Sequence, residues 1–261
     1  MPTDPVRGPV RADLVIRPAH DGDAAALAGI HVAARRAAPM PDPVHPDAVV
    51  HEHLARAIAR AGSGDGGRGG HEVWVAQEAR GRVVGYLRLD DAWLEDLYVH
   101  PAAAGAGVGS ALLGLAQAAR PAGFSLWVFE SNAPARAFYA RHGLVELERT
   151  DGSENEEQAP DVRMAWSGVD PVGYLRGLID DVDEQLGRLL ARRAALTAAV
   201  QPHKRSPGRD LARERAIAVA MAAHAPGLGV ERLERIVHTV ITESLAAAAD
   251  GPPAEPGVGG A

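Results

Sequence analysis

Two patterns of apolar and polar positions divide the chain. Between residues 14 and 166, short apolar runs typical of strands alternate with stretches whose apolar residues recur every three or four positions, as on one face of a helix. The predicted strands are Leu14–Ile16, Val73–Ala76, Val83–Leu89, Leu94–Val99 and Phe124–Phe129, and the predicted helices include Asp23–Ala38 and Ser110–Ala119. This mixture predicts an α/β or α+β domain.

The last third of the chain has only the helical pattern. We expect three helices, from Val172 to about Val200, from a cap at Asp210 to about Ala225, and from Val230 to Ala249. The first would be more than about 40 Å long, because an α-helix rises about 1.5 Å per residue. Its two shorter partners cannot cover the whole apolar stripe, so the pattern predicts a homodimer.

The change of pattern also predicts the domain boundaries. A chain of 261 residues has room for two hydrophobic cores. We place a first domain at 13–168, a linker with proline and glycine around 169–171, and an all-helical domain at 172–249. Residues 1–12 and 250–261 are rich in proline, glycine and small side chains, which predicts flexible tails.

Composition excludes several classes of protein. Apolar residues make up 46% of the chain, but no run reaches the roughly 18 residues of a membrane span, and the amino end lacks a signal-peptide core. We therefore expect a cytoplasmic protein without a membrane partner. The net charge of −7 disfavours nucleic acid, and the lack of cysteine excludes disulfides and thiolate ligands. His45, His51 and His53 lack the helical spacing of metal ligands, so no metal is expected.

A glycine loop follows the predicted strand 94–99. After His100 and Pro101 comes the segment Ala104 to Gly109, with the sequence Ala-Gly-Ala-Gly-Val-Gly, and then the helix that includes Ser110. Glycines allow the backbone amides of such a loop to turn inward, and the amino end of the following helix favours a phosphate group. The loop therefore predicts a pyrophosphate site.

A second motif lies at residues 131–144. Asn132 follows the predicted strand 124–129, Tyr139 lies in a short predicted helix, and Gly143 ends that helix. In this order and at this separation, the two motifs resemble the GNAT N-acetyltransferase family over roughly residues 13–168.

The resemblance implies an α+β fold, a mixed sheet with flanking helices, and acetyl-CoA as the co-substrate. By family position, Asn132 would steady the pantetheine arm and Tyr139 would protonate the leaving CoA thiolate. The implied cofactor-binding residues are Leu97, Val99, Ala104, Gly105, Gly107, Gly109, Ser110 and Asn132. Ala104 replaces a polar residue of the family's loop, which should weaken cofactor binding without abolishing it, because the backbone makes most of the contacts.

A catalytic base is expected among the carboxylates, because only a neutral amine attacks a thioester. Glu95 and Asp96 are neighbours on a predicted strand, so their side chains should face opposite sides and only one should line the cleft. Glu95 has the phase at which some relatives carry a base. The acidic segment 150–161 is predicted to be a hairpin loop; placed beside the acceptor site, it would favour a cationic substrate.

The helical part contains the only lysine of the chain, Lys204, among 27 basic residues. Arginine presents a planar fork that suits carboxylates, whereas lysine is a compact donor to a single oxygen. Residues 171–249 carry eleven basic residues against nine acidic ones. We interpret this as a binding site for a small anion that has carboxylates and one further acceptor.

Five polar motifs in residues 172–249 resemble the all-helical chorismate mutase family. They lie around Arg176, Arg193, Lys204, Arg213 and Ser244. The resemblance implies conversion of chorismate to prephenate in aromatic amino acid biosynthesis, a pericyclic step that needs no proton transfer or nucleophile. The protein has only to hold a compact conformer and stabilise the charge on the breaking ether.

Family position also implies a role for each residue. Arg176 of the partner chain, Arg193 and Arg213 would hold the carboxylates, and Ser244 would help. Lys204 would bind the ether oxygen, and Glu214, with Asp210 beside it, would bind the ring hydroxyl.

The spacing along the first helix agrees with a shared site. Arg176 lies 17 residues before Arg193, about 25 Å along one helix, so both can reach one small ligand only if Arg176 comes from an antiparallel partner. Lys204 lies 11 residues after Arg193, about three turns, so the two share a face if the helix persists past Pro202.

The chain is thus predicted to be a bifunctional enzyme, with three alternatives left open. Ala248 stands where the family commonly has a glutamine at the ether oxygen, so the helical domain could act on aminodeoxychorismate or isochorismate instead. The GNAT half could be a non-catalytic acyl-CoA binding module. The helices could serve only for dimerisation.

Overall fold

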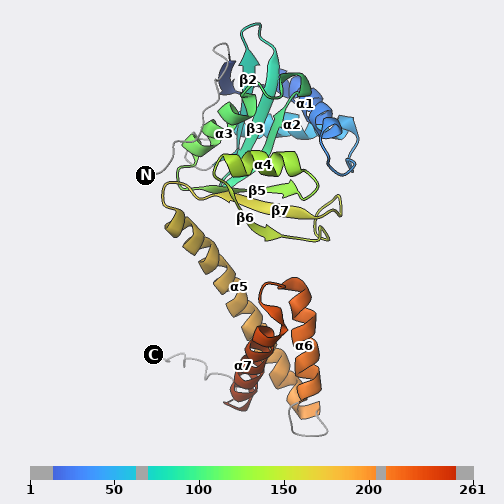
Figure 1. Ribbon diagram of the computed structural model, residues 1–261, viewed down its shortest axis with the longest axis vertical. Coiled ribbons are helices and arrows are strands. Elements are labelled where there is room, and N and C mark those ends of the chain that lie inside the picture. Colours follow the sequence, from blue (N-terminus) through green and yellow to red (C-terminus); the bar gives the residue numbers. More distant parts are fainter. Residues whose placement is uncertain (1–13, 63–69, 204–209, 251–261) are drawn as a thin grey trace, which may run out of the picture. The chain divides into compact units, whose positions relative to one another are not determined.

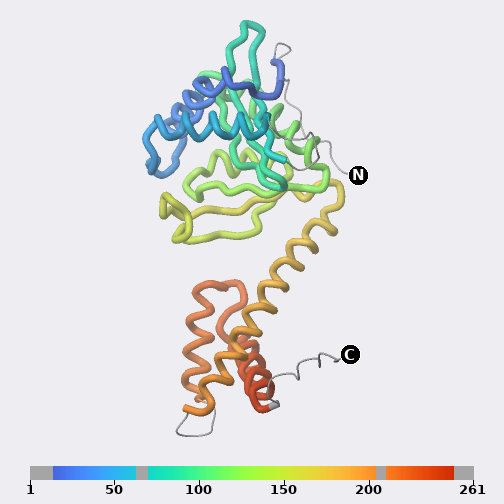
Figure 2. The backbone as a smooth tube through the Cα atoms, turned by 180° about the vertical axis from the view of Figure 1, so that it is seen from behind, coloured from blue at the N-terminus to red at the C-terminus, as the bar shows by residue number. Residues whose placement is uncertain are grey.

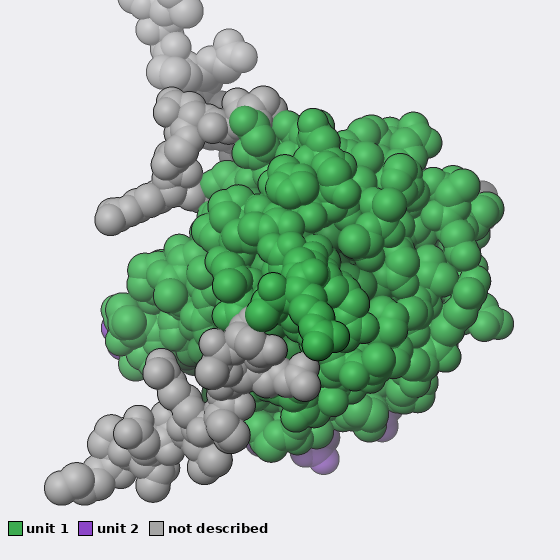
Figure 3. Space-filling model, turned by 90° about the horizontal axis from the view of Figure 1, so that it is seen from above, with its two compact units in different colours: residues 1–175 green, residues 176–261 purple. Residues whose placement is uncertain are grey.

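A computed structural model describes residues 14–62, 70–203 and 210–250 of the chain. It contains two compact units, Met1–Leu175 and Arg176–Ala261, which are coloured separately in Figure 3. Among the described residues, no helix combines the length and the apolar character needed to cross a membrane.

The first unit is built on a seven-stranded sheet with the order β1-β2-β3-β4-β5-β7-β6. Its strands are β1 (Leu14–Pro18), β2 (Glu72–Glu78), β3 (Val83–Asp90), β4 (Trp93–Val99), β5 (Phe124–Phe129), β6 (Val145–Arg149) and β7 (Asp161–Trp166). All neighbours pair antiparallel except β4 and β5, which are parallel. Parallel neighbours require a crossover, and the helix between these two strands provides it.

Helices cover both faces of this sheet. They are α1 (Ala24–Ala37), α2 (Asp47–Gly62), α3 (Val108–Ala119) and α4 (Ala133–Arg141). α3 and α4 lie in front of the sheet in Figure 1, whereas α1 and α2 lie in front of it in the reverse view of Figure 2. The unit is therefore a three-layer α+β fold, as the sequence predicts.

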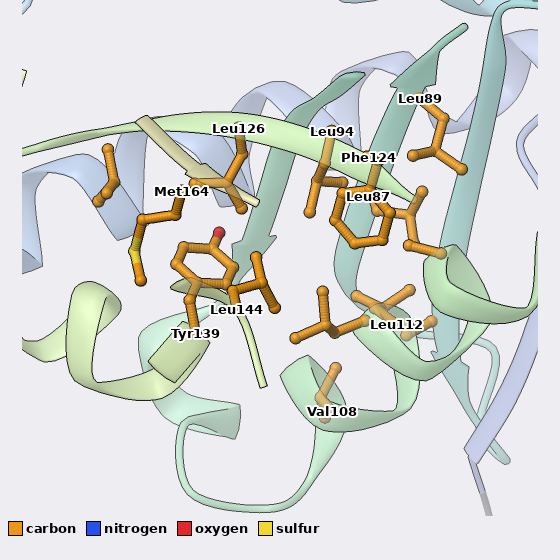
Figure 4. Packing of buried hydrophobic residues seen from close by; sticks show 14 of the residues in the cluster. Leu87, Leu89, Leu94, Val108, Leu112, Phe124, Leu126, Tyr139, Leu144 and Met164 are labelled. Atoms are coloured by element: carbon orange, nitrogen blue, oxygen red, sulfur yellow. The ribbon is translucent and has the colours of Figure 1, made fainter. Parts of the chain in front are cut away.

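Each layer boundary has its own hydrophobic core. α1 and α2 pack through Leu27, Ile30 and Leu54 on one face of β2 and β3. On the other face a larger cluster joins α3 and α4 to the central strands, and Figure 4 shows Leu112 of α3 packed beside Leu87 and Phe124. These side chains are almost completely buried, so this cluster holds the crossover helix against the sheet.

The parallel pair β4 and β5 separates after a short contact. The two strands are in register only at Trp93 and Ser125. β4 also contains a β-bulge, because Arg88 pairs with Asp96 and Leu89 pairs with Leu94, which leaves Glu95 as the extra residue. A gap in the sheet therefore opens toward the carboxyl ends of β4 and β5.

The second unit consists of the three predicted helices. Helix α5 (Pro171–Val200) begins on the first unit, where the Tyr174 hydroxyl lies 3.0 Å from Ser125 Oγ, and its later part enters the second unit. A short 3-10 helix, η3 (Gln201–His203), follows, and then α6 (Leu211–His224) and α7 (Gly229–Asp250). The second half of α5 runs beside α6 and α7 in both views (Figure 1, Figure 2).

The helical unit has a small core within one chain. Its buried residues are Ala218 of α6 and Leu233 and Val237 of α7. α5 buries none of its residues, and its apolar stripe is exposed at Ile179, Val182, Leu186, Leu189, Leu190 and Leu196. A single chain thus leaves uncovered the surface for which the sequence predicts a partner.

Most of the predicted elements are confirmed, and three elements were missed. The predicted strands and helices each correspond to an observed element, but α2, β6 and β7 were not predicted. β6 is a five-residue edge strand in which Val145 and Leu147 alternate with glutamates, but all five residues are exposed and neither apolar side chain joins a core. The acidic segment is the loop that joins β6 to β7, in agreement with the predicted hairpin.

Shortening a side chain in the larger cluster should destabilise the first unit. Leu112 is completely buried, so Leu112→Ala should lower the free energy of unfolding by roughly 2–5 kcal/mol through lost contacts and a residual cavity. Urea denaturation would measure this. Leu147→Ala on exposed β6 is the matched control and should change stability by less than about 0.5 kcal/mol. Equal effects of the two substitutions would contradict this description of the core.

Candidate active sites

A cleft of about 1750 Å³ lies in the first unit. It is lined by β4, the glycine loop, β5, α4, the loop between β6 and β7, and part of α1. All ten GNAT residues singled out from the sequence line it: Glu95, Leu97, Val99, Ala104, Gly105, Gly107, Gly109, Ser110, Asn132 and Tyr139. The fold thus brings residues from separate segments to one cavity.

The glycine loop has a conformation that its glycines make possible. Gly105 and Gly107 have φ angles of 75° and 81°, in the left-handed region that other residues rarely adopt. Gly107 is the N-cap of α3. The first amides of a helix have no acceptor within the helix, so those of α3 are available to an anion at this end of the cleft.

Ser110 is held by a histidine from the next motif. His142 Nδ1 lies 2.9 Å from the Phe138 carbonyl oxygen, which can only accept, so Nδ1 carries a proton. In a neutral ring Nε2 is then an acceptor, and it lies 3.0 Å from Ser110 Oγ. The Ser110 hydroxyl therefore donates to His142, while its oxygen still faces the loop.

Asn132 and Tyr139 approach the cleft from α4. Asn132 Oδ1 caps the helix by accepting from the Ala135 amide at 3.2 Å, which leaves the side-chain nitrogen as the group that can donate to a ligand. Tyr139 is 8% exposed, and no hydrogen bond links its hydroxyl to the described residues. Figure 4 shows the ring among Leu126, Leu144 and Met164, with the hydroxyl directed toward the strand of Leu126.

Burial decides the protonation state of Tyr139. Loss of solvent raises the pKa of its hydroxyl well above the ordinary value, and the nearby Tyr98 and Asp96 act in the same direction. The hydroxyl is therefore neutral at physiological pH. It can donate a proton to an anion that forms in the cleft.

The bulge in β4 corrects one expectation from the sequence. Regular alternation would place Glu95 and Asp96 on opposite faces, but both line the cleft. Arg88 lies between them: Nε is 2.7 Å from Asp96 Oδ2, and Nη2 is 3.7 Å from Glu95 Oε2. Glu95 has 40% of its side chain exposed and Asp96 only 12%, so Glu95 is the more accessible carboxylate.

His31 of α1 also lines the cleft, and no motif in the sequence predicts it. Its Nδ1 lies 2.9 Å from the hydroxyl of the fully buried Tyr86, and its ring centre is 4.5 Å from that of Tyr98. Burial lowers the pKa of His31, although Asp96 acts in the opposite direction. A lone histidine in a helix can be recognised as a candidate site residue only when its contacts are known.

The acidic loop between β6 and β7 forms one end of the cleft. Its Glu157 is 2.9 Å from Arg35 of α1, and both side chains are largely buried. Asn155 Nδ2 donates to Asp161 Oδ2 at 3.0 Å and to the Ala159 carbonyl at 2.8 Å. These bonds fix the path of the loop beside the cleft.

In the helical unit, two of the predicted site residues are in contact. Arg193 Nη1 of α5 donates to Ser244 Oγ of α7 at 2.8 Å, and it lies 3.3 Å from the Val240 carbonyl oxygen. Ser244 is 5% exposed and itself donates to the Val240 carbonyl oxygen at 2.6 Å. Glu214, mostly buried on α6, faces His238 at 3.8 Å.

The other predicted mutase residues are not assembled within one chain. Asp210 caps α6 by accepting from the amide of Arg213, whose side chain is exposed. Arg176 is exposed on α5 about 25 Å from Arg193, as the helical rise requires. The α-helix ends at Val200, and Lys204 lies outside the described residues.

Comparison with family profiles matches both units. Residues 69–146 match the acetyltransferase (GNAT) domain, and residues 175–248 match chorismate mutase type II. The chain combines a GNAT acetyltransferase domain with a chorismate mutase domain. Both families are enzymatic, so the chain has a bifunctional arrangement.

Comparison with solved structures finds several that are similar to part of this chain. YjaB from Escherichia coli in its apo form has a TM-score of 0.48 and 21% identity, over 60% of this chain and 99% of that chain. The PaiA N-acetyltransferase of Thermoplasma acidophilum, in complex with coenzyme A, has a TM-score of 0.47 and 20% identity, over 59% and 98%. YncA, a putative acetyltransferase from Salmonella typhimurium with acetyl-CoA, has 0.47 and 22%, over 61% and 96%. Comparison with curated protein sequences gives no match.

The buried histidine of the GNAT domain predicts a pH dependence of stability. Because burial lowers the pKa of His31 below its unfolded value of about 6.5, the unfolded chain binds more protons as the pH falls. This contribution to stability is therefore present above about pH 6.5 and is lost as the pH falls below it. His31→Gln should reduce the loss of stability between pH 7.5 and 5.5 in urea denaturation. An unchanged loss would show that His31 does not titrate in this way.

Proposed function

We propose that the GNAT domain is an acetyl-CoA-dependent N-acetyltransferase. The observation that carries the proposal is the buried Tyr139 hydroxyl, free of hydrogen bonds to described residues, in a cleft that begins at a glycine loop. The GNAT profile match over residues 69–146 supports it. We propose that this domain comprises residues 13–168.

The glycine loop and α3 would hold the pyrophosphate of the cofactor. The amides at the start of α3 and the left-handed glycines provide donors without side chains, so the loss of a polar residue at Ala104 is tolerated. Leu97 and Val99 would pair with the pantetheine arm through the backbone of β4, in the part of that strand that is not paired with β5. Asn132 would donate to the same arm.

The transfer step follows from the groups in the cleft. The nitrogen of a neutral amine attacks the thioester carbonyl, a C–N bond forms, and the C–S bond breaks. The acceptor ammonium first loses one proton to solvent through Glu95, which gives the neutral amine. After the C–N bond forms, the nitrogen loses a second proton by the same route. Tyr139 gives its proton to the leaving thiolate and recovers one from solvent. Glu95 suits its role because it is exposed and its contact with Arg88 is long, at 3.7 Å. Asp96 is less available, because it is bonded to Arg88 at 2.7 Å.

Removal of the Tyr139 hydroxyl should slow transfer without preventing cofactor binding. Tyr139→Phe should lower kcat by about 100-fold, because general-acid assistance to the thiolate is lost while the buried ring remains. Thiol release from acetyl-CoA in the presence of an amine panel would give kcat, and calorimetry would give the affinity for acetyl-CoA.

Phe138→Leu on the same helix provides a control for general disturbance of α4. Binding of acetyl-CoA with no amine-dependent thiol release by the intact protein would identify a non-catalytic acyl-CoA binding module instead.

We also propose that the helical domain, at 172–249, converts chorismate to prephenate. The Arg193–Ser244 contact supports this, because it fixes the position of a guanidinium whose remaining N–H groups can hold a carboxylate. Glu214 lies on the neighbouring helix and would accept from the ring hydroxyl. Arg213 and Asp210 would contribute at the start of α6, and Lys204 would donate to the ether oxygen.

The exposed stripe of α5 and the distance between Arg176 and Arg193 support a homodimer. An antiparallel copy of α5 would bury the apolar side chains and would bring its own Arg176 to the Arg193 site. Each dimer would then contain two shared sites.

A mixing experiment tests the shared site. Arg193→Ala and Arg176→Ala should each lower chorismate turnover, followed by ultraviolet absorbance, by more than about 100-fold. After refolding of an equal mixture, half of the dimers contain one intact site, so about a quarter of the activity should return. Arg188→Ala, which changes an exposed arginine paired with Glu184, is the matched control.

Failure of the mixture to regain activity would contradict a site shared between chains. Absence of chorismate turnover by the intact, dimeric protein would instead indicate that the helices serve only for dimerisation.

Because the side chain of Ala248 lacks a hydrogen-bond donor, we expect either slow turnover of chorismate or a preference for a related substrate. Ala248 lies one turn beyond Ser244 on α7, where an amide donor would otherwise approach the ether oxygen. Loss of one preorganised donor costs about 2–4 kcal/mol, which corresponds to tens-fold to several hundred-fold in rate. Parallel assays with chorismate, isochorismate and aminodeoxychorismate identify the preferred substrate.

A further inference from the structure

The GNAT cleft has two chemically different ends. At one end lie the glycine loop, the start of α3, and Arg141 with its neighbour His142, which contacts Ser110. At the other end lie the bulged part of β4 and the acidic loop between β6 and β7. Tyr139, more than nine-tenths buried and free of hydrogen bonds to described residues, marks the reaction centre. The acidic end must therefore receive the acetyl acceptor.

Carboxylates outnumber cations at the acceptor end. The six lining carboxylates are Glu95, Asp96, Glu154, Glu156, Glu157 and Asp161, and the two lining guanidinium groups are Arg35 and Arg88. Both guanidinium groups already have carboxylate partners, Glu157 and Asp96 respectively. An excess of negative charge therefore remains for a ligand to neutralise.

The acidic loop presents two of these carboxylates from a fixed support. Asp161 holds the loop through Asn155, and Glu157 holds it through Arg35. Glu154 and Glu156 are exposed, and Glu156 contacts only a histidine side chain, His45, at 2.8 Å. They can turn toward a cation without disturbing the bonds that anchor the loop.

The cleft also has an apolar lining that suits an alkyl chain. Trp127 lines the cleft and is 43% exposed, and Phe129 and Leu97 line it as well. An exposed indole face attracts both aliphatic carbon and ammonium groups. A ligand that combines an alkyl spacer with positive charges at both ends would match a cleft lined by carboxylates and by these apolar side chains.

We propose that the acceptor is an aliphatic diamine or polyamine. The reacting amine lies near Glu95 and Tyr139, and the distal ammonium binds Glu154 and Glu156. The proposal rests on the acetyltransferase function above and leaves its transfer step unchanged. An acceptor with a distal carboxylate is repelled at the same place.

Three amines of equal chain length test this preference. Butylamine, 1,4-diaminobutane and 4-aminobutanoate differ only in a neutral, positive or negative distal group. With saturating acetyl-CoA, kcat/KM from thiol release should be at least about tenfold higher for 1,4-diaminobutane than for butylamine, and lowest for 4-aminobutanoate. A tetra-cationic polyamine should be at least as good as the diamine.

Removing the charges of Glu154 and Glu156 tests whether these two residues cause the preference for a diamine. In Glu154→Gln/Glu156→Gln, the ratio of kcat/KM for 1,4-diaminobutane to that for butylamine should fall about tenfold, mainly through KM. Glu148→Gln is the matched control, because Glu148 is exposed on β6 but does not line the cleft, and it should leave the ratio unchanged.

The outcomes separate this inference from the acetyltransferase function. Amine-dependent thiol release with equal kcat/KM for all three amines, or a ratio unchanged in the double variant, would overturn the acceptor class while the acetyltransferase stands. No amine-dependent thiol release from any acceptor would overturn both.

Discussion

The separation of β4 from β5 is the constraint on which the first domain depends. Two parallel strands that share a single paired position leave backbone groups unpaired in the middle of a sheet. Such groups need partners, and in the proposed function the extended pantetheine arm of acetyl-CoA would provide them. The crossover helix α3 begins beside this gap, so the same topology brings the glycine loop and Tyr139 to one cleft. The bulge at Glu95 then turns a second carboxylate toward it.

The helical domain depends on a different constraint, the length of α5. A helix of 30 residues with no buried residue cannot be stabilised by the small core between α6 and α7. The exposed apolar stripe, and the separation of Arg176 from Arg193 in the proposed site, are both explained by the homodimer proposed above. In such an arrangement the packing that stabilises the domain also completes its site.

The two domains use opposite electrostatic solutions. In the proposed mutase site, an arginine that contacts Ser244 and the exposed arginines of α5 and α6 would provide positive charge for a dianion. In the proposed GNAT site, backbone amides would bind the anionic cofactor, and the carboxylates that line the cleft would receive a cationic acceptor. The sequence reflects this division, because its acidic net charge coexists with a slightly basic helical part.

The sequence by itself determined the elements and the local motifs. The spacing of apolar residues predicted most strands and all three helices of the second unit. The order of the glycine loop and Tyr139 predicted the cofactor side of the cleft. Both signals could be found in the sequence because they depend on near neighbours in the chain. The tertiary structure alone decided which carboxylates face the cleft, since a bulge shifts alternation only where two strands pair. It also decided that His31 lies against Tyr86 and that Arg35 anchors the acidic loop, because these contacts join segments 55 and 122 residues apart. No local pattern records a contact of that range.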